Sequence, residues 1–405
     1  MAPEGQATRS WTLLSALGAL GPRRSGTAGS ARALSWLSET LQQSGLAVDR
    51  QAFLAPNRTL YFGPAVTAIV LVALSVLQIA DRALVGTLVP FLMWVALVPL
   101  CGELLAMGLN CDLILPRTLT YNLEAEVTGS GPGEIVLVAH HDTQWSSWLF
   151  HPKLGLRLRW YFAAFYLGLF GVPALSTLAA FNGHPWVLPT LGALTALLAV
   201  LTLSLVAAAV FGQDVVGAND NGSGVAVAMA LAERAKAAVA EGTWPEAAAR
   251  LRLLLTGAEE VGERGMLHWL KTHRPQPAEV VFVNLDNVAG GTLRYLEKEG
   301  MLLPLRYSPA LLQVARGVAA NSGGALTTGS PLLLPTDMMW TSAQGYAAIT
   351  FIGQRDDGTM PNYHWPTDTV DQISMQHLAE VEDTLFAYLS AVWQEADRSL
   401  NTAES

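Results

Sequence analysis

Two histidines and an aspartate follow a short apolar run in the first half of the chain. The segment "VLVAHHDTQ" covers residues 136–144 and turns polar at His140. Side chains two residues apart on a strand share a face, so His140 and Asp142 point one way and His141 points the other way. A histidine paired with a carboxylate is a common form of an oriented metal ligand. By spacing alone, polar residues that merely end a strand are the more common explanation.

Other acidic residues and one histidine occupy comparable places. Glu259 and Glu260 end the run "LRLLLTGAEE", and Asp286 stands near the end of "EVVFVNLDN". Because Glu259 and Glu260 are neighbours, they cannot do the same work on the same face. Asp220 lies in the glycine-rich "GANDNGSG", and His364 lies in the loop "NYHWPTDT". Two histidines with several carboxylates and no cysteine suit a pair of zinc ions or another borderline metal.

The segments that position these residues indicate an α/β fold. The three runs that end in histidine or acidic side chains are short and almost continuously apolar, as buried parallel strands are. In an open α/β sheet the ligand site lies beyond the carboxyl ends of the strands, so the polar ends are expected to meet in one crevice. Residues 30–45 and 224–239 have the composition and spacing of helices. We therefore expect a mostly parallel twisted sheet flanked by helices.

Composition limits the classes of function. The 405 residues are 51% hydrophobic and 14% charged, whereas an average soluble domain has about 25% charged residues. A net charge of −9 without a long basic run gives no footprint for nucleic-acid binding, and that class is discarded. Cys101 and Cys111 are too few for a disulfide framework. A chain this apolar is expected to place part of itself in lipid.

The apolar excess is concentrated in two insertions. Residues 59–80 and 83–102 are uncharged, and residues 160–213 form a longer uncharged run that the turn sequence "NGHP" interrupts. About 20 residues of helix cross a hydrocarbon core. Apolar core helices are the alternative, but the paired runs favour four transmembrane helices in two hairpins, 59–110 and 160–213. Aromatic residues stand where the membrane interfaces would lie: Tyr61, Phe62, Trp160, Tyr161 and Trp186.

The rest of the chain reads as one discontinuous domain made of residues 1–58, 111–159 and 214–405. Each hairpin returns to the side from which it left, so the three pieces must share one compartment. Basic residues flank the spans on the domain side, and only Arg82 lies in a connecting turn. The positive-inside rule then predicts an integral, multi-pass protein of the cell or inner membrane with a cytoplasmic domain. The residues with this bias are Arg50, Arg58, Arg117, Lys153, Arg157 and Arg159.

Five motifs in this order resemble those of the co-catalytic zinc aminopeptidases, metallopeptidase family twenty-eight. They are "AHHDT", "GANDNGSG", "TGAEEVGERG", "NLDN" and "YHWPTDT". The opening segment "LLSALGALGPRRSGTAGSARA" is also similar to that of the family. The resemblance covers nearly all of the polar part of the chain and none of the four apolar runs. It makes a zinc peptidase domain the expectation for the three discontinuous pieces.

The resemblance implies a role for each polar residue. His140 and Asp286 would bind one zinc ion, Glu260 and His364 the other, and Asp220 would bridge the two, followed by a cis peptide at Asp220–Asn221. Glu259 would be the general base, Asp142 the partner that orients His140, and Asp368 a residue that orients the last loop. His141 would bind no metal. The implied cofactor is two zinc ions per chain.

The implied function is a membrane-anchored zinc exopeptidase, an aminopeptidase that hydrolyses peptide substrates through a metal-bridged water. One alternative is a glutaminyl cyclase-like acyltransferase with a single zinc, and another is an inactive receptor or scaffold of the same fold. A transporter-like role of the hairpins is a further possibility. Residues 336–346 either line a substrate pocket or belong to the core, and Ser223 serves its glycine-rich turn and is not a nucleophile.

Overall fold

The structure is a computed structural model that describes residues 8–57, 61–81, 87–105, 115–181, 184–300, 304–332 and 335–403. The chain forms two compact units. Unit 1 consists of Met1–Asn57, Arg117–Trp145 and Asp214–Ser405, and unit 2 consists of Arg58–Pro116 and Ser146–Gln213. Residues 146–159, which the sequence assigned to the α/β domain, belong to unit 2. Arg58, Arg82, Cys111 and Asn182 lie outside the described residues.

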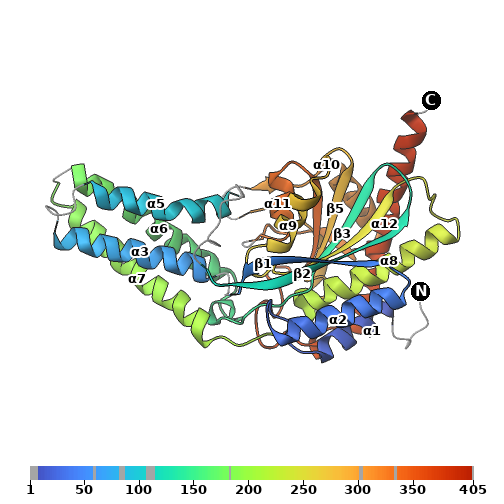
Figure 1. Ribbon diagram of the computed structural model, residues 1–405, viewed down its shortest axis with the longest axis horizontal. Helices are drawn as coiled ribbons and strands as arrows, with labels where there is room; N and C mark the ends of the chain where they lie inside the picture. The colour runs from blue at the N-terminus through green and yellow to red at the C-terminus, as the bar shows by residue number, and fades with distance from the viewer. Residues whose placement is uncertain are drawn as a thin grey trace. The chain divides into compact units, whose positions relative to one another are not determined.

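A mixed sheet forms the centre of unit 1, as Figure 1 shows. Its described strands stand in the order β1-β2-β4-β3-β5-β10-β6-β9. The central strands β4, β3, β5 and β10 run parallel. Strand β2 is antiparallel to both β1 and β4, whereas β6 is antiparallel to β10 and parallel to β9. The expected parallel sheet therefore describes the centre only. The bounds are β1 Val48–Pro56, β2 Arg117–Gly129, β3 Glu134–His140, β4 Arg250–Thr256, β5 Val280–Asp286, β6 Thr292–Tyr295, β9 Leu326–Thr328 and β10 Ala347–Gln354. A separate two-stranded ribbon pairs β7 Lys298–Glu299 with β8 Leu305–Arg306.

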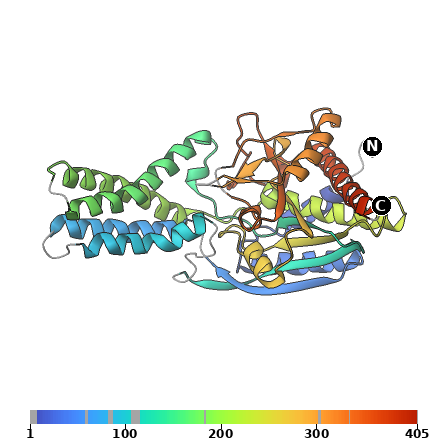
Figure 2. The same cartoon turned by 90° about the horizontal axis from the view of Figure 1, so that it is seen from above.

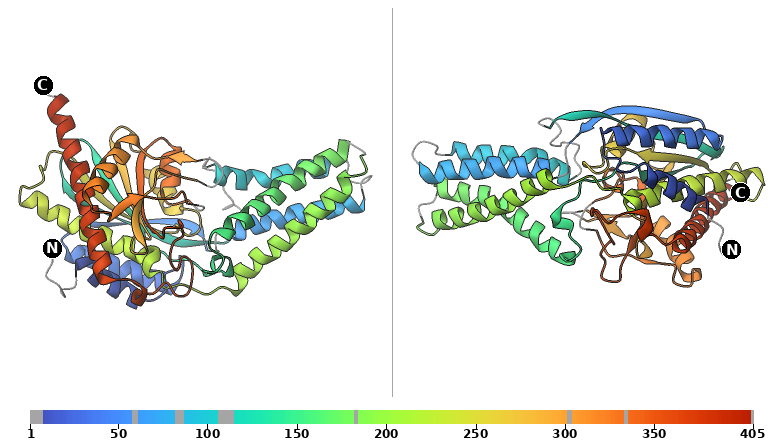
Figure 3. Two further views of the ribbon diagram at one scale, coloured as in Figure 1. Left: turned by 180° about the vertical axis from the view of Figure 1, so that it is seen from behind. Right: turned by 90° about the horizontal axis from the view of Figure 1, so that it is seen from below.

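Helices cover both faces of this sheet. Alanine-rich α8 (Gly224–Ala240) lies against β2, β3, β4 and β5, and its small side chains allow the close approach. Amphipathic α9 (Arg264–His273) packs at β1 on the opposite face, where His268 stacks on Phe53 with ring centroids 4.8 Å apart. The remaining helices are α1 Arg9–Ala19, α2 Ala28–Gln43, α10 Pro309–Asn321, α11 Met338–Ala343 and α12 Met375–Ala403. Figure 3 shows α12, in red, beside α10.

The helices of unit 2 are nearly free of charge. They are α3 Phe62–Ala80, α5 Leu88–Leu104, α6 Leu158–Phe181 and α7 Val187–Phe211, and Figure 2 shows them side by side. Among the described residues, α3, α6 and α7 are long and apolar enough to cross a membrane, whereas α5 has 17 residues. At 1.5 Å per residue α5 spans only about 26 Å. The expectation of four spanning helices is therefore supported for three of them.

Unit 2 buries several polar side chains and exposes many large apolar ones. Buried Ser75 and Thr195 hydrogen-bond at 2.6 Å, and the buried Gln78 amide exchanges hydrogen bonds with Ser176. Of the large apolar side chains that are exposed in the described structure, all but Leu54 and Leu119 belong to this unit. Tyr61, which the sequence places near an interface, is buried and packs near Phe150. A water-soluble bundle has the opposite distribution.

Candidate metal centre

Three neighbouring strands bring four of the expected site residues to one edge of the sheet. β3 lies between β4 and β5, and all three run parallel. His140 is the last residue of β3 and pairs with Thr256, the last residue of β4. Glu259 and Glu260 follow β4 by a few residues, and Asp286 ends β5. The expected meeting of the polar strand ends is therefore observed, because the carboxyl ends of these strands coincide.

Two loops supply the remaining residues. Asp220 lies in the kinked turn Ala218–Ser223, and the peptide bond to Asn221 is cis, as the resemblance implied. His364 lies between β10 and α12, with Tyr363 stacked on its ring at 3.7 Å. The carboxylate of Asp368 accepts hydrogen bonds from the backbone N–H groups of Asn219 and Asp220. Asp368 thus ties the loop that carries His364 to the turn that carries Asp220.

Asp220 divides its two carboxylate oxygens between two sets of side chains. Its Oδ1 lies 3.4 Å from His140 Nε2, which lies 3.6 Å from Asp286 Oδ1. Its Oδ2 lies 3.1 Å from His364 Nε2, which lies 3.3 Å from Glu260 Oε2. We call these set A (His140, Asp286) and set B (Glu260, His364). The Oε2 atom of Glu259 lies at 3.8 Å from His140 Nε2 and belongs to neither pair.

The spacing within each set fits a metal ion. Nitrogen and oxygen ligands about 2.0–2.1 Å from a tetrahedral zinc ion stand about 3.3 Å from one another, close to the separations in both sets. His140 with Asp220 and Glu260, and His140 with Glu259 and Asp286, also offer ligand atoms within 4.8 Å of one another. All these side chains are buried. Glu260 Oε1 is buried and accepts no hydrogen bond from the described residues. A buried carboxylate oxygen of this kind is costly unless a cation compensates it.

His140 is oriented through the backbone. Its Nδ1 lies 3.2 Å from the carbonyl oxygen of Asp142 and 3.8 Å from the Asp142 carboxylate. That carboxylate accepts hydrogen bonds from the backbone N–H of Glu259 and from the hydroxyl of Ser25. Asp142 therefore contacts two parts of the site with two different groups. Its backbone carbonyl faces His140, and its side-chain carboxylate holds the segment of Glu259.

No role was predicted from the sequence for three residues of the site. Gln144 donates to the carboxylate of Glu260, and Asn287 donates to that of Asp286. Buried Arg23 donates to the carbonyl oxygens of His141, Val216 and Gly217, which fixes the loops of His140 and Asp220. Arg23 stands in the opening segment that resembles the family and Asn287 in the quoted "NLDN", so their positions could have suggested them. Gln144 ends the quoted segment "VLVAHHDTQ", but its residue type and spacing do not indicate a contact with Glu260.

Burial and mutual repulsion shift the pKa values of the site. Burial, with Glu260 and Asp286 nearby, raises the pKa of Glu259 well above its ordinary value. Burial and the charge of Asp220 raise the pKa of Glu260 to about 7. Burial lowers the pKa of His364, but the carboxylates of Glu260 and Asp220 outweigh it and raise that pKa to about 9. So many buried acids at one place require cations, either protons or metal ions.

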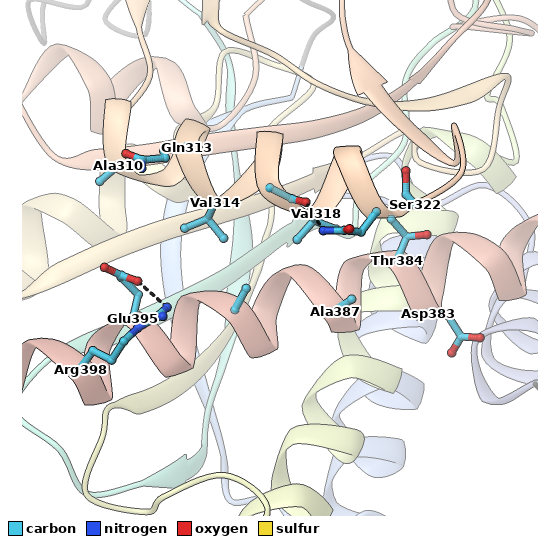
Figure 4. A pocket seen from close by; sticks show the side chains of 13 residues that line it. Ala310, Gln313, Val314, Val318, Ser322, Asp383, Thr384, Ala387, Glu395 and Arg398 are labelled. Atoms are coloured by element: carbon cyan, nitrogen blue, oxygen red, sulfur yellow. Dashed lines mark hydrogen bonds and ion pairs between the residues drawn. The ribbon is translucent and has the colours of Figure 1, made fainter.

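Other candidate residues have structural roles. The Ser223 hydroxyl donates to the carbonyl of Asn219 within the turn, as expected. Met338, Met339 and Trp340 are buried core residues. A surface groove of about 710 Å³ between α10 and α12, shown in Figure 4, is lined mainly by small side chains and by the ion pair of Glu395 with Arg398. No residue of sets A and B lines this groove.

The sequence matches the family described as Peptidase family M28 over residues 203–389, less than half of the chain. This range includes Asp220, Glu259, Glu260, Asp286 and His364. No curated protein matches the sequence.

Solved structures share the fold at low sequence identity. A zinc aminopeptidase from Bacillus subtilis has a TM-score of 0.53 and 16% identity, over 94% of this chain and 94% of that chain. A Zn-dependent exopeptidase from Parabacteroides distasonis has a TM-score of 0.55 and 13% identity, over 96% and 99%. A glutaminyl cyclase from Porphyromonas gingivalis has a TM-score of 0.54 and 16% identity, over 94% and 96%. At these identities the likeness shows the fold, which zinc peptidases and glutaminyl cyclases have in common.

Proposed function

We propose that this chain is a membrane-anchored zinc exopeptidase, an aminopeptidase that hydrolyses the amino-terminal peptide bond of peptide substrates. The observation that carries the proposal is Asp220, whose two carboxylate oxygens face the two sets separately. A carboxylate placed in this way suits a bridge between two ions. His140 and Asp286 would hold one ion, and Glu260 and His364 the other.

Glu259 is the residue of this site that is best placed to move a proton. Two zinc ions held at such a site would supply Lewis acidity and lower the pKa of a water molecule. Glu259 belongs to neither set, yet its Oε2 lies 3.8 Å from His140 Nε2. Its segment is fixed because the Asp142 carboxylate accepts the backbone N–H of Glu259. We therefore assign Glu259 to accept the proton of the attacking water and to return it to the leaving amine.

The surroundings of the site favour a substrate that is held by its amino terminus. A substrate carboxylate would need a cationic side chain as its partner. Arg23 could have bound a substrate carboxylate, but its guanidinium already donates to three backbone carbonyls. We therefore favour an aminopeptidase over a carboxypeptidase.

A substrate screen tests this assignment. The full chain, purified in detergent and supplied with zinc, is expected to release the first residue from unblocked peptides and aminoacyl amides. The same peptides with an acetylated amino terminus should remain intact. Release of the carboxyl-terminal residue from acetylated peptides would contradict the aminopeptidase assignment while leaving a zinc peptidase in place.

The shared fold makes a glutaminyl cyclase the second candidate. Its support is the likeness to glutaminyl cyclases, which have TM-scores comparable to those of the peptidases. A peptide that begins with glutamine separates the two, because a cyclase releases ammonia and leaves a blocked peptide whereas an aminopeptidase releases free glutamine.

We propose that a lipid bilayer surrounds unit 2. Its buried hydrogen bonds and exposed apolar side chains suit a bundle in lipid, where polar side chains join the helices. Exposed Trp160 and Phe181 stand near the two ends of α6. Twenty-one residues separate them along the sequence, a rise of about 32 Å, close to the thickness of a hydrocarbon core of about 30 Å. We propose that α3, α6 and α7 cross the membrane and that α5 completes the bundle.

A further inference from the structure

Gln144 holds the carboxylate of set B. Its side-chain Nε2 donates to Glu260 Oε2 at 2.8 Å and to the backbone oxygen of Glu260 at 3.3 Å. Its own Oε1 accepts the backbone N–H of Trp145, so the amide is held at both ends. The side chain is only 3% exposed. Glu260 Oε2 is the same atom that faces His364 Nε2.

Asn287 has the matching position at set A. Its Nδ2 donates to Asp286 Oδ1 at 2.8 Å, and Asp286 Oδ1 is the atom that faces His140 Nε2. The Asn287 side-chain oxygen accepts from Asn219 Nδ2, and its backbone N–H donates to Asn221 Oδ1. This residue has a φ of 53°, which asparagine and aspartate tolerate better than most residues. Each set therefore has one amide that binds the carboxylate oxygen nearest its histidine.

We propose that Gln144 and Asn287 are positioning residues that tune the affinity of the two metal ions separately. Gln144 acts on the ion of set B, and Asn287 acts on the ion of set A. This inference rests on the proposed two-ion centre and adds to it which residue controls which ion.

A neutral amide is suited to this task. A carboxylate oxygen has two lone pairs, so an amide N–H occupies one and leaves the other for an ion. A lysine or arginine at the same place would fix the oxygen but would also neutralise the carboxylate and so compete with the metal. The amide fixes the direction of the oxygen and leaves its negative charge intact. Loss of such an outer hydrogen bond typically weakens metal binding by about 10- to 100-fold.

Two matched variants remove the donors and keep the shapes. Gln144→Glu retains an oxygen to accept from Trp145, and Asn287→Asp retains an oxygen to accept from Asn219 and tolerates the same φ. Each replaces an N–H donor to a ligand carboxylate by a second acceptor. Gln354→Glu is the control. Gln354 is also fully buried, and its amide exchanges hydrogen bonds with the backbone of Ser330, so the chemical change is the same but faces no ligand carboxylate.

Zinc affinity provides the readout. The full chain in detergent is titrated with zinc against a chromophoric chelator, and bound zinc is counted after dialysis at a fixed free zinc concentration. We expect Gln144→Glu and Asn287→Asp each to weaken one ion by about 10- to 100-fold and the other by much less. In a His364→Ala background, which removes the histidine of set B and should empty that site, only Asn287→Asp should still weaken the remaining ion. Gln354→Glu should leave both affinities unchanged.

The outcomes of the zinc titration distinguish a failure of the separate tuning from a failure of the two-ion centre. If both variants bind two ions as tightly as the wild type, or if each weakens both ions equally, the separate tuning is refuted although the two-ion centre stands. If Gln354→Glu has the same effect as the site variants, the effect is one of folding and the inference is also refuted. A wild-type chain that binds fewer than two ions would instead refute the proposed centre itself.

Discussion

At the scale of single residues, two adjacent glutamates have separate environments. Glu260 faces His364 and accepts the amide of Gln144, so its side chain is fixed at set B. Glu259 faces His140 at a longer distance, and its backbone N–H is held by Asp142. Their different partners favour Glu260 as a metal ligand and Glu259 as a proton acceptor. Mutation of the two residues should therefore have different consequences.

Glu259→Gln is expected to leave zinc binding close to that of the wild type and to reduce turnover. Loss of a general base typically costs about 10²- to 10⁴-fold. The measurement is kcat on an aminoacyl substrate together with the zinc content of the same sample. Loss of zinc from this variant, or full activity, would mean that the roles of Glu259 and Glu260 have been assigned wrongly.

Asp220→Asn is expected to weaken both ions together. The substitution keeps the shape of the side chain but removes the charge that faces both histidines at 3.4 Å and 3.1 Å. Zinc titration should show lower affinity in both steps, and Asp383→Asn, on exposed α12 surface beside Arg234, serves as the control. An unchanged affinity for either ion would exclude the bridging role.

At the scale of secondary-structure elements, the strands that carry the site could be predicted from the sequence. The contacts between the loops of the site could not. Apolar runs that end in His140, Glu259 and Asp286 are visible in the sequence, and β3, β4 and β5 appear where these runs lie. The antiparallel strands β1 and β2 were not predicted, because their charged residues interrupt the continuous apolar runs by which the buried strands were recognised. Contacts between loops, such as that of Gln144 with Glu260, join residues more than a hundred positions apart. Local patterns do not encode such contacts.

The contact of Glu299 with Thr336 makes a pH-dependent contribution to stability. Glu299 in β7 is buried and accepts two hydrogen bonds from Thr336. Burial outweighs these bonds and raises the pKa of Glu299 from its ordinary value of 4.5 to about 8. The folded chain therefore retains a proton that the unfolded chain releases between these pH values. The resulting stabilisation is complete below about pH 4.5 and is lost as the pH rises through about 8.

Glu299→Gln should reduce this pH dependence. The amide stays neutral, so the free energy of unfolding should no longer fall by up to roughly 1.4 kcal/mol per pH unit on account of this residue. Thermal unfolding of wild type and variant in detergent at pH 6 and pH 8.5 measures the difference. The variant should lose less stability than the wild type over this interval, and an identical loss in both proteins would contradict the buried, protonated state of Glu299.

At the scale of the whole molecule, two units of opposite character alternate along the chain. Unit 1 has a core between a sheet and helices, whereas unit 2 exposes apolar side chains and buries polar ones. Composition revealed this division, because uncharged runs of about 20 residues stand out against the rest of the chain. The short length of α5 did not follow from composition, because an uncharged run does not mark where its helix begins and ends.

The positive-inside rule predicts that unit 1 faces the cytoplasm and that Asp81, at the end of α3, faces the outside. In a chain whose Cys101 and Cys111 are replaced by serine, a cysteine at Asp81 should react with an impermeant reagent added to intact cells. A cysteine at exposed Glu39 in α2 should react only after the cells are opened. The reverse pattern would invert the orientation, and reaction of both cysteines in intact cells would contradict the bundle as a membrane anchor.

The number of zinc ions per chain decides whether Asp220 bridges a two-ion centre. The full-length protein, purified in detergent and dialysed against buffered zinc, is analysed for metal and for protein concentration in the same sample. We expect about two zinc ions per chain, removal of both by a chelator, and return of peptide hydrolysis when zinc is restored. A single tightly bound zinc ion in an active preparation, or activity that persists without metal, would contradict the two-ion centre built around Asp220.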